Sequence, residues 1–206
     1  MNIPFLHIDI ITLVQAVGYI GLFAIIFAES GLFFGFFLPG DSLLFTAGLL
    51  ASQGLFNYYA LAVIFALAAI TGDSVGYLFG KKVGSKIFNR EDSFFFHKNH
   101  VERTHNFYEK YGTKTIVLAR FVPIVRTFAP ILAGVGNMKY KTFLKYNIVG
   151  GLLWGVGISF AGFYLGSKIP GIENYLTYII LAIIVISILP IIFEFAREYF
   201  KKNSTH

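Results

Sequence analysis

Apolar residues run through the chain in long stretches separated by short polar intervals, at a length typical of membrane-spanning helices. Four stretches are uninterrupted, namely residues 10–28, 58–79, 143–165 and 175–193. A helix needs about 20 predominantly apolar residues to cross a hydrocarbon core of about 30 Å. The pattern therefore predicts an all-α integral membrane protein with about four transmembrane helices.

Two further apolar stretches are interrupted by helix-breaking residues. Residues 31–51 have Pro39 and Gly40 at their centre, and residues 115–135 contain Pro123 and Pro130. Proline removes a backbone donor and kinks a helix, and glycine weakens it. We interpret each stretch as a re-entrant hairpin of two half-helices, whose irregular backbone must be buried in protein or line a water-filled cavity.

The two halves of the chain resemble each other at a constant offset of 86 residues. Residues 47–84 align without a gap on residues 133–170, and seven of the 38 positions are identical. Each unit consists of a broken hairpin followed by an uninterrupted span. We predict that the two hairpins oppose each other in an inverted repeat, the arrangement that places the binding site of many secondary transporters between the halves.

The remaining segments are polar and complete a single membrane domain over residues 1–206. Residues 81–114 are interpreted as a cytoplasmic amphipathic segment on the membrane surface, in which the phenylalanines at 94–96 act as an interfacial anchor. Residues 194–206 form the predicted cytoplasmic tail.

The number of charged residues supports an integral membrane protein, and their distribution predicts its orientation in the membrane. Charged residues make up 14% of the chain, against about 25% in a soluble domain, so a soluble globule and a disordered chain are both excluded. If residues 81–114 are cytoplasmic and each hairpin returns to the face that it enters from, Lys168 is the one basic residue outside. The positive-inside rule then predicts cytoplasmic N- and C-termini. The net charge of +6 reports this topology and requires no nucleic-acid partner.

Four ionisable residues lie within apolar stretches or at their entry: Glu29, Asp41, Arg120 and Arg126. A charge at the bilayer centre costs about 2.5–3.5 kcal/mol on insertion scales. If the hairpins meet tip to tip, the two acids and the two arginines share one cavity. In a functional interpretation, arginine binds an anion bidentately while a carboxylate exchanges a proton. In a structural interpretation, the four residues are buried ion pairs that only hold the hairpins together.

Asp73 is a secondary candidate. It lies near Lys81, close to the predicted cytoplasmic boundary. We expect it to cap a helix or to sit at the membrane interface, and we place a transport role second.

No other constellation of catalytic or metal-binding residues is visible. The chain has no cysteine, and His97, His100 and His105 lie in a polar segment without the spacing of a zinc site. The sequence also contains no glycine-rich phosphate loop, nucleophile elbow or HExxH motif. We therefore expect no metal, no cofactor and no enzymatic activity such as lipid phosphatase.

Three stretches resemble signatures of the DedA family, also called the SNARE-associated or VTT-domain family. They are FAESGLFFGFFLPGDSLLFTAGLLA, GDSVGYLFGKKVG and LARFVPIVRTFAPILAGVGNMKYKTFLKYNIVGGLLW. The resemblance covers roughly residues 10–195. It implies an inner-membrane protein with two facing re-entrant hairpins, an acidic pair at Glu29 and Asp41, and an arginine pair at Arg120 and Arg126. Bacterial members of the family are linked to proton-dependent membrane homeostasis, some recycle undecaprenyl phosphate, and eukaryotic relatives scramble phospholipids.

Together these observations predict a transporter that moves undecaprenyl phosphate or a similar polyprenyl phosphate across the cytoplasmic membrane, coupled to protons. Arg120 and Arg126 would bind the phosphate, and Glu29 and Asp41 would exchange protons. Two alternatives stay open: a phospholipid scramblase without gradient coupling, and a proton-coupled exchanger of small cations or drugs. The expected partners are a membrane lipid and protons, and a homo-oligomer is compatible with the sequence.

Overall fold

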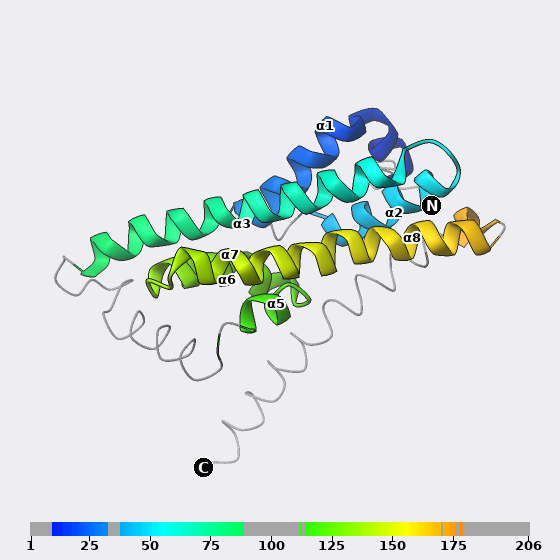
Figure 1. Cartoon of the computed structure of the whole chain (residues 1–206). Coiled ribbons are helices and arrows are strands. Elements are labelled where there is room, and N and C mark those ends of the chain that lie inside the picture. The colour runs from blue at the N-terminus through cyan, green and yellow to red at the C-terminus, as the bar shows by residue number, and fades with distance from the viewer. Residues whose placement is uncertain are drawn as a thin grey trace, which may run out of the picture.

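A computed structural model describes residues 10–32, 38–88, 112, 114–169, 171–175 and 178, and within these ranges the chain is helical and contains no strand (Figure 1). Helix α1 (Ile10–Gly31) is kinked at Gly18, whose φ is 56°. Helix α3 (Tyr58–Phe88) has 31 residues. Helix α7 (Tyr140–Gly151), the π-helical turn η2 (Leu152–Val156) and helix α8 (Gly157–Lys168) form one continuous rod. The all-α prediction is confirmed for this part of the chain.

Among the described residues, three helices are long and apolar enough to cross a membrane, at Leu13–Gly31, Tyr58–Val83 and Tyr140–Lys168. They correspond to the first three uninterrupted stretches of the sequence. The fourth expected span, 175–193, lies almost wholly outside the described residues, as do most of segment 81–114 and the tail at 194–206. A short 3₁₀ turn, η3 (Ile172–Tyr175), follows the rod.

Helix α3 continues to Phe88, whereas the apolar pattern ends at residue 79. The additional turns contain lysines and no proline, and lysine is a good helix former. A helix therefore extends from the apolar region into the polar segment without a break.

The structure describes a short helix after the break in the first interrupted stretch, and two short helices separated by non-helical backbone in the second. In the first, α1 ends at Gly31 and α2 (Gly40–Ser52) begins directly after Pro39. In the second, α5 (Thr115–Ala119) is followed by α6 (Pro123–Val135), and Val122 between them is extended, with φ −118° and ψ 108°. An extended residue is expected before a proline, and proline is favoured at the first position of a helix. Pro130 lies inside α6, and the helix continues on both sides of it.

Two helix crossings of the same type hold the molecule together: α2 packs on α8, and α6 packs on α3. A Cβ atom at Gly162 would lie 2.0 Å from the carbonyl oxygen of Phe45, and one at Gly80 would lie 2.0 Å from that of Ile131. The offset of 86 residues maps Phe45 onto Ile131. Glycine at these positions permits the close backbone approach that is common between membrane helices.

The two crossings support the internal repeat that the sequence predicts. The offset also maps Gly48, which contacts α8, onto Gly134, which contacts α3. The second crossing lies one helical turn further along the long helix. In Figure 1, α3 and the α7–α8 rod run side by side in opposite directions, as two inverted copies of one helix would.

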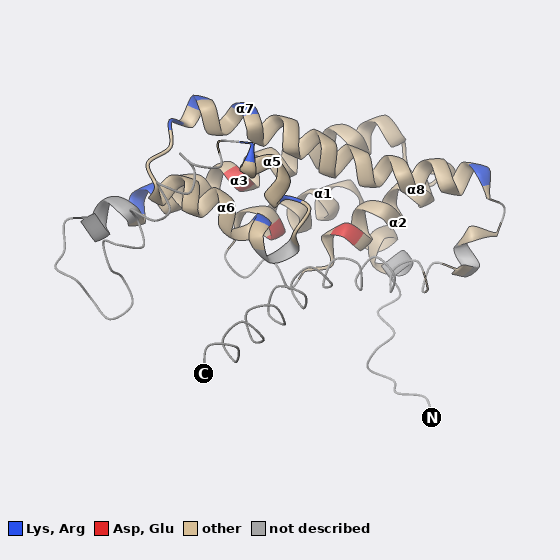
Figure 2. Ribbon diagram, turned by 90° about the horizontal axis from the view of Figure 1, so that it is seen from below, with Lys and Arg blue, Asp and Glu red and all other residues tan. Residues whose placement is uncertain are grey.

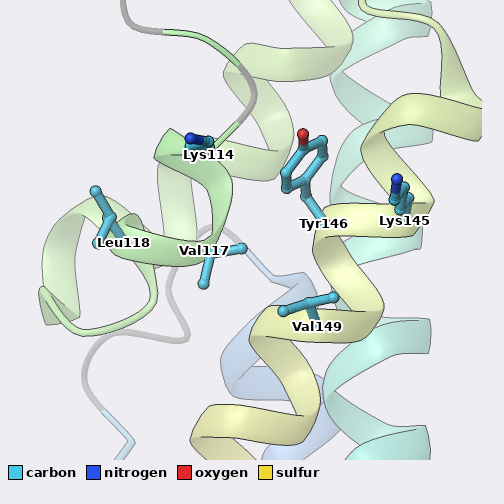
Figure 3. Close-up of a pocket in the computed structure, with 6 residues that line it drawn as sticks. All are labelled: Lys114, Val117, Leu118, Lys145, Tyr146 and Val149. Atoms are coloured by element: carbon cyan, nitrogen blue, oxygen red, sulfur yellow. The ribbon is translucent and has the colours of Figure 1, made fainter.

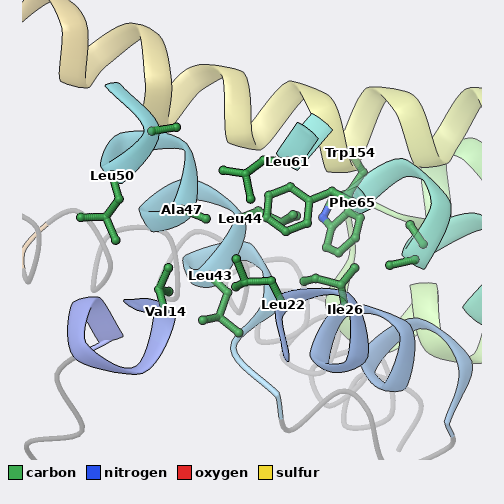
Figure 4. Close-up of a cluster of buried hydrophobic side chains, with 13 residues drawn as sticks. Val14, Leu22, Ile26, Leu43, Leu44, Ala47, Leu50, Leu61, Phe65 and Trp154 are labelled. Carbon is green, nitrogen blue, oxygen red and sulfur yellow. The ribbon is translucent and has the colours of Figure 1, made fainter. Parts of the chain in front are cut away.

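Beside the crossings, apolar side chains of α1, α2, α3 and η2 form the largest core cluster (Figure 4). Its largest fully buried members include Leu22, Leu44, Phe65 and Trp154. This cluster fixes the end of α1 and the start of α2 against the rod, and these are the places from which the charged side chains project.

Basic residues gather at one end of the molecule, where α3 ends and α7 begins (Figure 2). We call this the basic end. Its described members are Lys81, Lys82, Lys114, Lys139, Lys141 and Lys145. Lys168, in the last turn of α8, is at the opposite end of the rod. Most of these lysines thus lie at one end of the molecule, as the predicted orientation in the membrane requires.

Candidate functional site

Arg126 of α6 connects the two acidic residues that the sequence places in and beside the first broken stretch. Its guanidinium forms an ion pair with Glu29, at the end of α1, and its Nη1 donates to Asp41 Oδ1 of α2 at 2.7 Å. Glu29 is fully buried and Arg126 is 8% exposed. Helices α1, α2 and α6 therefore meet at a buried cluster of two carboxylates and one guanidinium.

Each residue of the sequence Pro39-Gly40-Asp41 contributes to the geometry of this cluster. Pro39 precedes the first residue of α2, and Asp41 lies in the first turn of the helix, where a negative charge is favoured by the helix dipole. Gly40 makes room for the neighbouring acid, because a Cβ atom there would lie 1.4 Å from Glu29 Oε2. Any larger residue at position 40 would displace the Glu29 carboxylate.

Trp154, in the π-helical turn η2, completes the cluster. Its indole nitrogen donates to Asp41 Oδ1 at 2.7 Å, and its ring lies 4.7 Å from Arg126 Cζ. One side chain thus contacts both partners of the Asp41–Arg126 pair, by a hydrogen bond and by a cation–π interaction. Single π-helical turns inside α-helices are frequent at functional sites.

Arg120 belongs to a second buried cluster. Its Nη2 group forms an ion pair with Asp73 of α3 and also donates to the side-chain oxygen of Asn147 on α7. The Asn147 amide in turn donates to the carbonyl oxygen of Ile70 at 2.9 Å. Arg120, Asp73 and Asn147 are each at most 4% exposed. This cluster joins the break between α5 and α6 to both long helices.

The structure thus buries four of the five ionisable candidates, leaves Asp41 partly exposed, and divides the five into two groups. The expected meeting of acids with arginines is observed for Glu29, Asp41 and Arg126, whereas Arg120 pairs with Asp73 instead. Asp73 lies in the middle of α3 and is 3% exposed. It therefore does not cap a helix, so this part of the expected role is wrong, and it forms a buried ion pair with Arg120 instead.

Sequence reasoning did not identify two polar members of these clusters, Asn147 and Trp154. A signal was present for both. Asn147 is a polar amide between apolar residues of a predicted span, and Trp154 is the one tryptophan of the chain. A buried indole N–H usually has a hydrogen-bond acceptor, so a tryptophan within an apolar span suggests an acceptor nearby.

The two clusters together hold three carboxyl groups and two guanidinium groups. Glu29 Oε2 and the Nε atoms of both arginines have no hydrogen-bond partner among the described residues. Both guanidiniums therefore retain donor capacity for a further anion. Within the described ranges no group of three histidine or acidic side chains could hold a metal ion.

Comparison with known proteins identifies relatives over nearly the whole chain. The model of the VTT domain matches residues 38–164. The protein named DedA in Escherichia coli K12 is 48% identical over 200 residues, which cover 94% of this chain and 91% of the relative. An uncharacterized membrane protein of Mycobacterium tuberculosis H37Rv is 48% identical over 181 residues, 87% of this chain and 79% of the relative. The inner membrane protein YqjA of E. coli K12 is 30% identical over 178 residues, 86% of this chain and 80% of the relative. No solved structure matches.

Proposed function

Because the chain belongs to the DedA family of VTT-domain membrane proteins, we propose that it is a transporter that moves a phosphate-bearing lipid across the cytoplasmic membrane, coupled to protons. The substrate class is undecaprenyl phosphate or a similar polyprenyl phosphate. In this proposal the basic end faces the cytoplasm, as do both termini, since basic residues are retained on that side.

The observation that carries the proposal is the bridging position of Arg126. A guanidinium that holds carboxylates from two other helices is costly as a purely structural device, because desolvation offsets most of the attraction between buried charges. Such an arrangement is useful if the carboxylates accept hydrogen bonds from the Arg126 N–H groups in the absence of substrate. A phosphate group would then replace the carboxylates as the acceptor when it binds. Arginine suits this exchange because it stays charged and binds carboxylate and phosphate with the same bidentate geometry.

Proton coupling follows from this exchange of partners. When a phosphate takes the Arg126 donors, Glu29 or Asp41 loses its counter-ion while it remains buried. An unpaired carboxylate in a medium of low dielectric constant is neutralised by protonation. Binding of the lipid phosphate and uptake of a proton would therefore accompany each other, and release of the lipid on the other face would return the proton.

Reconstitution into liposomes with labelled undecaprenyl phosphate tests the proposal. Replacing Arg126 with Gln removes the charge and retains an amide donor, so we expect translocation to fall by about 100-fold or more, as the loss of a buried charged hydrogen bond of about 3 kcal/mol predicts. Lys168→Gln removes one positive charge at the opposite end and should leave the rate unchanged. Equal rates for Arg126→Gln and the parent would refute the proposal.

The same assay separates the two alternatives. A scramblase would move ordinary phospholipids and would be insensitive to collapse of the proton gradient. An exchanger of cations or drugs would lose transport on substitution of Glu29 but retain it after Arg126→Gln, because the acids would bind the substrate. We expect gradient-dependent movement of the polyprenyl phosphate and loss of transport in both variants.

A further inference from the structure

A groove opens between α5 and α7 at the basic end, outside the two buried clusters (Figure 3). It has a volume of about 300 Å³. The lining residues are Lys114, Val117 and Leu118 from the α5 side and Lys145, Tyr146 and Val149 from α7.

The accessible lining of the groove is apolar, and the charged ends of two lysines lie beside one end of it. In Figure 3 the ammonium groups of Lys114 and Lys145 and the hydroxyl of Tyr146 lie toward one end, and Val117 and Val149 lie toward the other. Leu118 is 68% exposed and Val149 is 44% exposed, so the apolar lining is open to the surroundings of the helices. Neither lysine forms an ion pair with any residue in the described part of the chain.

Arg120 lies directly behind this groove. A Cβ atom at Gly150, next to Val149, would be 2.7 Å from Arg120 Cδ and 3.4 Å from Val117 Cα. The absence of a side chain at Gly150 thus lets the Arg120 side chain pass between α5 and α7, and its Nε atom has no hydrogen-bond partner among the described residues. The groove lies on the outer side of the contact between α5 and α7, and the buried Arg120 lies on the inner side of the same contact.

We propose that this groove is the docking site through which a membrane lipid with a phosphate headgroup enters the protein from the leaflet at the basic end. The lysines attract the phosphate, and Val117, Leu118 and Val149 contact the hydrocarbon chain. Arg120 lies behind the apolar end of the groove, on the inner side of the α5–α7 contact. The identity of the ligand rests on the proposed function, whereas the site itself rests on charge, exposure and shape.

Charge complementarity selects this occupant. Basic residues at a membrane surface attract anionic lipids, and each contributes roughly fivefold to the preference over a zwitterionic lipid. An acidic protein segment would match the lysines but not the open apolar lining of the groove. A lipid matches both, because its hydrocarbon chain suits the apolar groove while its phosphate reaches the lysines at one end of the groove.

Quenching by brominated lipids tests the site in the full-length protein. The chain has no cysteine, so Val149→Cys gives a single attachment point for a bimane fluorophore. In phosphatidylcholine vesicles, we expect brominated phosphatidate to quench this probe at an at least fivefold lower mole fraction than brominated phosphatidylcholine. The same probe at Leu67→Cys, an exposed apolar position of α3, should be quenched equally by both lipids.

Matched charge reversals show whether the groove or the general charge of the basic end is responsible. Lys114→Glu with Lys145→Glu should abolish the preference for phosphatidate and slow translocation of the polyprenyl phosphate. Lys139→Glu with Lys141→Glu changes the net charge of the basic end by the same amount, outside the groove. This pair should leave the preference for phosphatidate and the translocation rate unchanged. Equal effects of the two pairs, or equal quenching at Val149 by both lipids, would overturn the proposal.

Two further results distinguish this inference from the proposed function. If the probe at Val149 prefers phosphatidate but the parent protein moves no lipid, the docking site stands and the transport function fails. If the parent moves lipid but no brominated lipid reaches the probe at Val149, another part of the protein covers the groove, and the docking site fails while the function stands.

Discussion

Arg126 interacts with every other charged or aromatic side chain of its cluster. It is buried, it is shared between carboxylates of two helices, and an aromatic ring covers it. Removing one partner of a buried charge cluster leaves an uncompensated charge, which typically costs about 3–5 kcal/mol. With both acids ionised the cluster carries one excess negative charge, so binding of an anion or of a proton changes its charge balance.

We expect Trp154 to position the side chains of Asp41 and Arg126 without itself binding the phosphate or a proton. Trp154→Phe keeps a ring over Arg126 but loses the N–H donor to Asp41, so we expect a stability loss of about 1–2 kcal/mol. Thermal unfolding in detergent measures this loss. Trp154→Leu removes the ring as well and should destabilise more.

The transport readout separates positioning from simple packing. We expect Trp154→Phe to slow translocation because Asp41 and Arg126 lose a shared contact, while Leu22→Met, a conservative change in the same core cluster, leaves the rate unchanged. If Trp154→Phe and Leu22→Met have the same effects on stability and rate, the hydrogen bond to Asp41 has no positioning role.

At the level of the elements, the glycine crossings decide how closely the short helices approach the long ones. Gly162→Ala introduces a Cβ atom 2.0 Å from the Phe45 carbonyl oxygen, on rigid backbone that cannot yield as a side chain would. We expect α2 and α8 to separate, with a loss of stability toward the upper end of the usual range of about 1–3 kcal/mol for overpacking. Thermal unfolding of the purified protein measures it.

Gly157→Ala in the same helix provides the matched control. Nothing lies within 4 Å of a Cβ atom at that position. Alanine is a better helix former than glycine by about 1 kcal/mol, so this variant should be as stable as the parent or slightly more stable. Similar losses in the two variants would show that the crossing tolerates wider separation and that close approach is unimportant.

Much of the element structure follows from the sequence pattern. The three described spans coincide with uninterrupted apolar stretches because only apolar length decides whether a helix can cross the bilayer. The start of α2 after Pro39 and the start of α6 at Pro123 follow from the restricted backbone of proline. Pro130 does not end α6, so the break expected at this proline is not observed.

The candidate site could be predicted only in part, because its pairings depend on lateral packing. The cost of burying Glu29, Asp41 and Arg126 indicates that they pair, but not which acid meets which arginine. The pairing of Asp73 with Arg120 requires the register of α3 against α5, and no spacing in the sequence encodes this register. Asn147 and Trp154 stand out in the sequence as polar groups within an apolar span, but their partners Arg120 and Asp41 depend on how the helices pack.

For the molecule as a whole, the two halves repeat one packing solution and differ in chemistry. The short glycine-containing helix of each half packs against the long helix of the other half, α2 on α8 and α6 on α3, and the two long helices run in opposite directions. The acids of the first cluster come from the N-terminal half, and its arginine comes from the C-terminal half. A movement of one half against the other would therefore change the contacts of Arg126 as well as those of both crossings.

The central claim is that lipid phosphate replaces carboxylates as the partner of Arg126 and that a displaced carboxyl group takes up a proton. Calorimetric titration of the purified protein with a polyprenyl phosphate, in two buffers of different ionisation enthalpy, measures proton uptake on binding. Near pH 8 the account predicts uptake of about one proton per lipid bound, and no uptake in Glu29→Gln with Asp41→Asn. Binding of the lipid to the parent protein without proton uptake would contradict the account.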